Sequence, residues 1–551
     1  MKNLIRFLKT ESPDPWIFIL GMGLLAGVLS GMLLGIVNAA AIIATAPGEV
    51  NSYYFLLFLA CVAGLWYAKK QALIRTTVAV ETMLKDLRVR VCDKIRQCEL
   101  IHMEPIQKTD AFTKIAHDTN SISQATLGMA NACQSIITMF VSLLYLAWLS
   151  KPAFAISVLV FGLIAYTYST RRKEIQSRLA GVIRLESDLL GSLNHIFDGF
   201  KELKMNRRKS DALFQNFRET ADKNCEIKVD VGTLFIINLL YSEVIFFLLL
   251  ATLIFVLPRY WSGASALMLQ ITVTVMFITG PLSVLLGSAP VFARAETSLG
   301  NLYGLEAAVE EAFTQSAPNG QAASTRFRDF REVALENATF NYLDSAGKPT
   351  FSVGPVTLAA RRGELLFIVG GNGSGKSTAV KLLTSLYPVQ QGVVRVDHRL
   401  VNEATVHEYR ELFSIILADF HLFDRLYGLE DIPRERVAAL IREMELEDKV
   451  TFADGRFNTL SLSTGQRKRL GLIVALLEDR PICVFDEWAA DQDQQFRKYF
   501  YEVILRNLKT AGKTVIVVTH DDRYWKHADQ IVKFDEGRIV EFGSRGAEPA
   551  E

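Results

Sequence analysis

Nine consecutive residues, 370–378, combine glycine, lysine and hydroxyl side chains in an order suited to holding a phosphate chain. They follow an apolar run, 365–369, that predicts a buried strand, and precede 379–383, which predicts the start of a helix. The glycines permit positive φ and close backbone approach, Lys376 can reach the β- and γ-phosphates, and the Ser377 hydroxyl is placed to bind Mg²⁺. The segment therefore predicts a nucleoside triphosphate site built from Gly370, Asn372, Gly373, Ser374, Gly375, Lys376, Ser377 and Thr378.

A second candidate site is the acidic pair Asp486 and Glu487, which ends the apolar run 482–485. At the end of a strand, such a pair supplies one carboxylate to Mg²⁺ and a second that can polarise an attacking water. Acidic pairs also end strands by chance. A glycine-bearing helix start at 462–466, shortly before this pair, favours the functional interpretation, with Asp486 as metal ligand and Glu487 as catalytic base.

The elements that must position these residues belong to two kinds of domain. Half of the 551 residues are apolar, the mean hydropathy is +0.21, and the net charge of +1 argues against a nucleic-acid binder. Six apolar segments within the first 295 residues are suited to crossing a lipid bilayer. They are residues 16–46, 50–68, 121–150, 152–170, 231–257 and 260–293.

The segments between these spans carry very different charge. Residues 69–120 and 171–230 contain 10 and 13 lysines and arginines, whereas the three opposite loops contain none, one and one. The positive-inside rule then places both termini and the two long connections in the cytoplasm. Helix-forming runs predict that the connections extend the spans as two helical arms, with tips near 107–112 and 206–211.

The domain boundaries follow from this reading. We expect an all-α membrane domain over 1–295, a polar linker over 296–325, and an α/β nucleotide-binding domain over 326–551. The six cysteines form no C-x-x-C pair, and we interpret them as free thiols.

Further motifs carry a resemblance to a known family. Residues 462–466, Leu-Ser-Thr-Gly-Gln, are similar to the signature motif of ATP-binding cassette (ABC) transporters, with Thr464 replacing a glycine. Tyr342 matches the aromatic that stacks on adenine, Asp493 the D-loop aspartate, and His520 the switch histidine at the γ-phosphate. The order of these motifs resembles an exporter-type (type IV) ABC transporter with fused membrane and ATPase domains. The resemblance adds Tyr342, Ser463, Thr464, Gly465, Gln466 and Asp493 to the ATP site and His520 to the catalytic groups.

The resemblance also implies partners and a mechanism. In this family the signature motif closes over ATP bound to the P-loop of a second ATPase domain. One P-loop, residues 370–378, and six spans make half a transporter. We therefore expect a homodimer that uses ATP and Mg²⁺, with a heterodimer as the alternative. Alternating access would move cargo across a bacterial inner membrane, with the ATPase domain in the cytoplasm.

One position departs from the family pattern. Ala418 stands where a glutamine usually contacts Mg²⁺, and an alanine cannot bind metal. Either Asp419 or a water replaces it, or the coupling differs; an ordinary exposed carboxylate is the alternative for Asp419.

Local sequences in the ATPase half narrow the cargo. Residues 351–355, 414–424 and 486–493, with Trp488 in place of a proline, resemble a branch that exports cyclic peptides and peptide siderophores, including a pyoverdine precursor. The alternatives are a lipid flippase or multidrug exporter and, more remotely, a non-transporting ATP-gated regulator or channel. A periplasmic adaptor is a further partner left open.

Glu243 is an ionisable residue within an apolar span. Its cost in lipid predicts that it faces a cargo cavity, although a helix–helix hydrogen bond or a place near the water boundary would also account for it. Asn38 and Gln270 are weaker cavity candidates.

Overall fold

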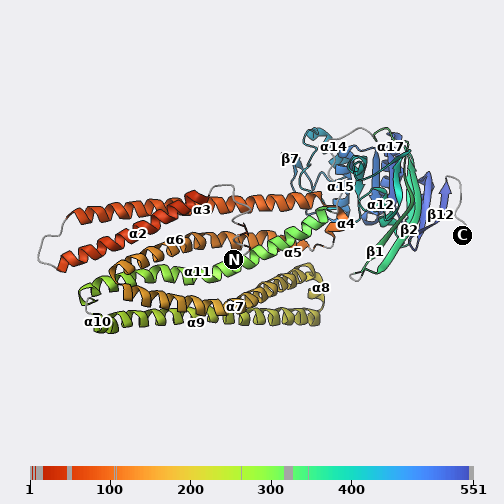
Figure 1. The fold of residues 1–551 in the computed structure, drawn as a ribbon. Helices are drawn as coiled ribbons and strands as arrows, with labels where there is room; N and C mark the ends of the chain where they lie inside the picture. The colour runs from red at the N-terminus through yellow and green to blue at the C-terminus, as the bar shows by residue number, and fades with distance from the viewer. Residues whose placement is uncertain are drawn as a thin grey trace. The chain divides into compact units, whose positions relative to one another are not determined.

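The computed structural model describes residues 3, 6, 7, 16–45, 52–104, 106, 108–261, 264–314, 327–344 and 347–544. The chain divides into two compact units (Figure 1). Residues 1–96 and 106–311 form the first, which we call the helical unit. Residues 97–105 and 312–551 form the second, which we call the α/β unit.

Among the described residues of the helical unit, six helices are long and apolar enough to cross a membrane. They are α2 (Trp16–Thr45), α3 (Ser52–Gln97), α6 (Thr119–Leu149), α7 (Lys151–Asp198), α9 (Arg207–Ala251) and α11 (Ala264–Thr314). Shorter helices join them: α5 (Lys108–Thr113), η1 (Lys114–Asp118), α8 (Phe200–Met205), η2 (Thr252–Val256) and α10 (Leu257–Tyr260).

The ends of these long helices follow local sequence signals. The side chain of Ser150 accepts a hydrogen bond from the Ala153 N–H and Pro152 stands in the first turn of α7, a favoured N-terminal arrangement. Asn206 interrupts the chain between α8 and α9 and caps α9 through the Lys209 N–H, which is within the predicted tip. The first tip was predicted too late in the sequence, because residues 108–112 belong to α5 and the chain leaves α3 after Gln97.

The predicted linker is a second difference. Residues 296–314 are the last part of α11, because leucines at helical spacing bury Leu299, Leu302 and Leu305. Leu299 and Leu302 pack in a core with Val80 and Met83 of α3. The remainder of the predicted linker, 315–325, lies outside the described residues.

The helical unit buries one stripe of each helix and leaves large apolar side chains on its surface. Leu146 of α6, Ile164 of α7 and Leu249 of α9 share one buried core. Trp148 and Phe255 are 80% and 78% exposed. Such a surface suits a hydrocarbon environment.

The α/β unit contains a six-stranded sheet, a four-stranded antiparallel sheet and a small hairpin among its described residues. The first has the order β12-β11-β3-β10-β9-β6, parallel except for β12; the second has the order β2-β1-β4-β5. The strands are β1 (Glu332–Leu343), β2 (Pro349–Arg361), β3 (Leu365–Gly370), β4 (Gln391–Val396), β5 (Arg399–Leu400), β6 (Phe413–Ile416), β7 (Phe452–Ala453), β8 (Arg456–Phe457), β9 (Ile482–Asp486), β10 (Thr514–Val518), β11 (Gln530–Asp535) and β12 (Arg538–Ser544). The helices are α4 (Leu100–Met103), α12 (Lys376–Leu383), α13 (Val406–Arg410), α14 (Arg434–Glu443), α15 (Thr464–Glu478), η3 (Trp488–Asp491), α16 (Gln494–Tyr499), η4 (Phe500–Ile504), α17 (Leu505–Thr510) and η5 (Asp522–His527).

The buried central strands of the six-stranded sheet position the candidate site residues. Strands β9 and β10 are buried along their whole length, with side chains feeding separate cores on the two faces of the sheet. Because neighbouring parallel strands end at one edge, the segments after β3, β9 and β10 meet there. They bring together the loop 371–375, Asp486 at the end of β9 with Glu487 directly after it, and His520.

A candidate nucleotide site

The loop between β3 and α12 requires glycine at two positions. Gly370 has φ 143°, and a Cβ there would lie 2.2 Å from the Phe534 carbonyl oxygen. Gly375, with φ 98°, caps α12 in the left-handed conformation. The Lys376 side chain is 4% exposed, and its Nζ donates to the carbonyls of Gly370 at 2.9 Å and Gly371 at 2.8 Å. The loop thus holds a cation beside a helix N-terminus, which suits a phosphate group.

Asp486 and Ser377 are together, as a shared Mg²⁺ would require. Asp486 is 2% exposed, and its Oδ1 has no hydrogen-bond partner among the described residues. Burial raises the pKa of Asp486, against the opposing effects of a Ser377 hydrogen bond and the Lys376 charge. An unsatisfied buried carboxylate oxygen next to a hydroxyl fits a Mg²⁺ ion that takes its remaining ligands from phosphate and water. Asp419 is on an exposed turn, close enough for its charge to contribute to the raised pKa of Asp486.

Glu487 and His520 line one small cleft with Thr519 and Asp521. Glu487 has φ 49° and ψ 32°, an unusual left-handed conformation for a residue other than glycine. Its N–H donates to the Val518 carbonyl at 3.1 Å, and its Oε1 is 4.0 Å from the Lys376 ammonium. A carboxylate beside a phosphate-binding lysine, with an imidazole across the cleft, can orient and deprotonate a water.

Tyr342 lies against the phosphate-binding loop. Its hydroxyl is 3.1 Å from the Thr378 Oγ1, and its ring contacts Phe340 edge-on at 5.0 Å. The half-buried ring is therefore fixed beside the loop, where a nucleobase could stack on it.

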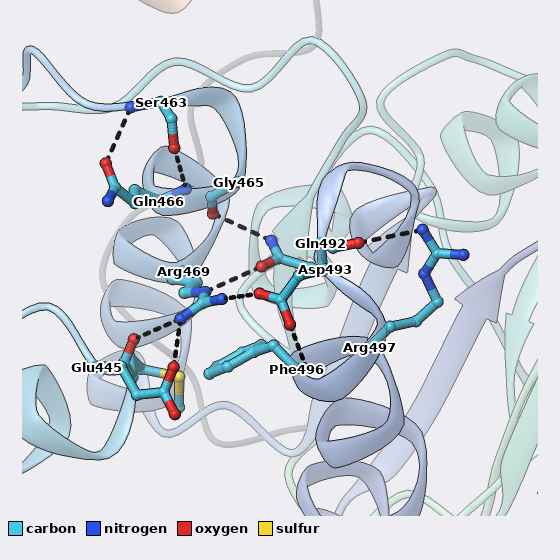
Figure 2. Close-up of polar contacts among 10 residues, drawn as sticks. Glu445, Ser463, Gly465, Gln466, Arg469, Gln492, Asp493, Phe496 and Arg497 are labelled. Atoms are coloured by element: carbon cyan, nitrogen blue, oxygen red, sulfur yellow. Dashed lines mark hydrogen bonds and ion pairs between the residues drawn. The ribbon is translucent and has the colours of Figure 1, made fainter.

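Residues 463–466 form the N-terminus of α15 (Figure 2). The Ser463 Oγ accepts from the Gln466 N–H at 3.3 Å, and the Gln466 side chain accepts from the Ser463 N–H at 3.1 Å, a reciprocal cap. Thr464 is exposed. Gly465 packs against the segment that follows β9, where a Cβ would lie 2.7 Å from the Asp491 carbonyl oxygen. No hydrogen bond or ion pair joins this motif to the loop 370–378 in the described part of the chain.

Arg469, which sequence reasoning missed, ties α15 to the residues after Glu487 (Figure 2). Its guanidinium contacts Gln492 at 3.0 Å, Asp493 at 2.6 Å and Glu445 at 3.0 Å, and lies 3.6 Å from the centre of the Phe496 ring. Asp493 also caps α16, and the Phe496 N–H is the main reason why its pKa is lowered. Asp493, predicted to belong to the ATP site, is thus a link between helices within this chain.

A second set of residues that the sequence did not reveal connects α4 to the rest of the α/β unit. Arg410 binds the carboxylate of Glu99 through two nitrogens, and the Tyr387 hydroxyl donates to Glu104 at 2.6 Å. Burial and the hydrogen bond to Glu104 raise the pKa of Tyr387. The acidic residues around 99–104 were the available signal, but their partners are about 300 residues away in sequence.

In the helical unit, α6, α7, α9 and α11 line a cleft of about 510 Å³. A smaller pocket of about 150 Å³ lies next to it and shares Phe235, Ile236 and Pro290. The larger cleft carries Lys228 and Arg294; Lys228 pairs with Glu186, and Arg294 is exposed.

The polar residues of the spans that were predicted to face a cargo cavity do not line this cleft. Glu243 is exposed on α9 and does not line either pocket, and the structure gives it no hydrogen bond to a described residue. Asn38 is fully buried and donates to Thr274 at 3.1 Å, so it cannot touch cargo in this conformation. Gln270 is partly buried, with an unpartnered Oε1 among the described residues.

The fold and site define a membrane protein of six candidate spans joined to a P-loop ATPase. A sequence model described as "ABC transporter" matches residues 353–490. The ATP-binding protein SyrD of Pseudomonas syringae pv. syringae is 31% identical over 98% of this chain and 96% of its own length. The chain belongs to the ABC transporter family, as a half-transporter whose ATP hydrolysis is coupled to transport.

One further relative and one solved structure are also similar to this chain. The ATP-dependent lipid A-core flippase of Vibrio vulnificus is 24% identical over 84% of this chain and 80% of its own. The structure of a bacterial Atm1-family ABC exporter with ATP bound matches with a TM-score of 0.77 at 18% identity, covering 100% of this chain and 99% of that one. The exporter-type fold is thereby shown for the whole chain.

Proposed function

We propose that this protein is a homodimeric exporter of a bacterial inner membrane that moves a peptide-derived amphiphile out of the cytoplasm. A cyclic peptide or a siderophore precursor such as that of pyoverdine is the expected kind of cargo. The observation that favours an amphiphile is the cleft of the helical unit, which combines an apolar wall with the exposed Arg294 beside the Lys228–Glu186 ion pair. An amphiphile with an acyl or aromatic part and a carboxylate is complementary to both.

In this proposal ATP hydrolysis would supply the energy, and Mg²⁺ would neutralise the charge of the bound phosphates. Ser377 and Asp486 would hold the metal, Glu487 would orient and deprotonate the attacking water, and His520 would contact the γ-phosphate. The exposed α15 N-terminus, residues 463–466, completes the site of a second copy, since it makes no contact with the phosphate loop of its own chain within the described residues. Two copies then provide two complete sites.

A lipid flippase is the second candidate, because a lipid A-type molecule is also an anionic amphiphile and relatives of this chain carry that name. The peptide assignment rests on the resemblance of residues 351–355, 414–424 and 486–493 to the peptide-exporting branch. Reconstitution in proteoliposomes separates the two. We expect an acidic lipopeptide to stimulate ATPase activity and lipid A to leave it at the basal rate; the reverse result would assign the flippase.

The cleft itself is tested by Arg294→Gln. Loss of one charge-assisted hydrogen bond should raise the lipopeptide concentration for half-maximal stimulation by about 10-fold. The matched control is Arg207→Gln, which removes a 94% exposed arginine at the start of α9, outside the cleft. Equal responses of the two variants, or a changed basal rate in Arg294→Gln alone, would contradict cargo binding at Arg294.

A further inference from the structure

The backbone of Glu487 is held in a conformation that it would not adopt unaided. Its φ of 49° is in the left-handed region, where side chains other than glycine are strained. Such strain persists only where surrounding contacts hold it. On one side the Glu487 N–H is bound by the Val518 carbonyl of β10. The contact on the other side comes from α15.

Lys468 of α15 makes that contact. Its side chain is 5% exposed, and its Nζ donates to the Glu487 carbonyl oxygen at 2.7 Å. The same ammonium pairs with the Asp491 carboxylate at 2.7 Å. A buried ammonium without a counter-charge is costly, so Asp491 is what allows a lysine to occupy this position.

Trp488 locks the neighbouring residue to the same turn of helix. Its indole N–H donates to the Lys468 carbonyl at 2.8 Å, and its ring stacks on Phe500 with 4.3 Å between centroids. Trp488 is 1% exposed. Lys468 therefore binds both residues of the turn: its side chain contacts Glu487, and its backbone carbonyl contacts Trp488.

We infer that Lys468, with Asp491 as its counter-ion, is a positioning residue that fixes the Glu487 loop for ATP hydrolysis. The inference rests on the proposed role of Glu487 as the base. Lys468 touches the backbone of Glu487 and not its carboxylate, so it acts on where the carboxylate points. It also joins the catalytic loop directly to the helix that begins at Ser463.

The test compares three variants of the full-length transporter in proteoliposomes. Lys468→Met removes the ammonium with little change in length, Lys468→Arg keeps a cationic donor, and Asp491→Asn weakens the ion pair. Misplacement of a catalytic group lowers turnover strongly, so Lys468→Met should lower kcat by about 10- to 100-fold with KM for ATP nearly unchanged. Lys468→Arg should recover part of this loss, and Asp491→Asn should lower kcat by about 3-fold.

Lys498→Met is the matched control. The Lys498 side chain is 65% exposed, and its ion pair with Glu502 is long, at 3.9 Å. A folded Lys468→Met with kcat close to that of wild type, or with KM raised as much as kcat is lowered, would overturn the inference. If Lys468→Met does not fold, the partly exposed Asp491 still decides: Asp491→Asn with wild-type kcat overturns it. Glu487→Gln separates the two proposals. Full ATPase activity in that variant would refute the role of Glu487 as the general base, independently of the results for the Lys468 variants.

Discussion

Arg469 in the α/β unit and Asn38 in the helical unit are both buried polar side chains that join separate helices. Arg469 uses its guanidinium on Gln492, Asp493 and Glu445 and lies on the Phe496 ring. Asn38 donates to Thr274 and, at 3.4 Å, to Tyr145, while its Oδ1 has no partner among the described residues.

The contrast teaches how differently helices are held together at these two places. Many directed, charged hydrogen bonds fix one arrangement of α15 against the catalytic loop, as hydrolysis requires of groups that must be held in place. Around Asn38, a few neutral polar contacts between apolar helices hold the packing more weakly, although charged pairs such as Lys228–Glu186 join other helices of the same unit. The next three predictions test this contrast, beginning with the catalytic loop that the charged network supports.

Glu487→Gln should have the largest effect. Removing a general base costs about 10²- to 10⁴-fold in turnover, while ATP binding by the phosphate loop is preserved. ATPase rate and nucleotide affinity measured on the same preparation check this. Glu502→Gln, a change of a carboxylate outside the cleft, is the control. Near-wild-type ATPase activity in Glu487→Gln would refute the assignment.

Arg469→Met should come next, as a loss of stability. The variant loses its hydrogen bonds to Gln492, Asp493 and Glu445, and we expect the free energy of unfolding of the α/β unit to fall by about 2–3 kcal/mol. The acidic partners can rehydrate, since the side chains of Asp493 and Glu445 are 58% and 66% exposed, which limits the loss.

Thermal unfolding of the full-length protein, followed with and without ATP, provides the measurement for Arg469→Met. Arg467→Met is its control, because Arg467 is the exposed neighbour on the same helix. If both variants unfold at the same temperature, the network does not stabilise the α/β unit.

Asn38→Leu should have the smallest effect. Hydrogen bonds between membrane helices contribute about 0.6 kcal/mol on average, and Asn38 is only half satisfied. A double-mutant cycle with Thr274→Val isolates the 3.1 Å contact. A coupling energy as large as the effect of Arg469→Met would remove the contrast between the two units.

How much could be predicted differs along the chain. The strand, glycine loop and helix around residues 370–378 were predicted correctly, because the positive φ angles, the helix N-terminus and the lysine all lie within nine residues. The end of the membrane domain was not, since composition at 296–314 resembles a linker while burial of Leu299 and Leu302 makes it helix. Asp493 was identified by its position in a motif, whereas its ion pair with Arg469 depended on packing.

The sequence by itself determined the six apolar spans, the glycine loop between β3 and α12, and the acidic pair at the end of β9. Each of these is local: hydropathy over a helix length, a turn that only glycine can make, or polar residues directly at the end of an apolar strand. The tertiary structure alone decided that Lys468 holds the Glu487 carbonyl and that four helices form a cleft ending at Arg294. Those contacts join residues far apart in sequence, and only the packing of helices on the sheet and on one another brings them within bonding distance.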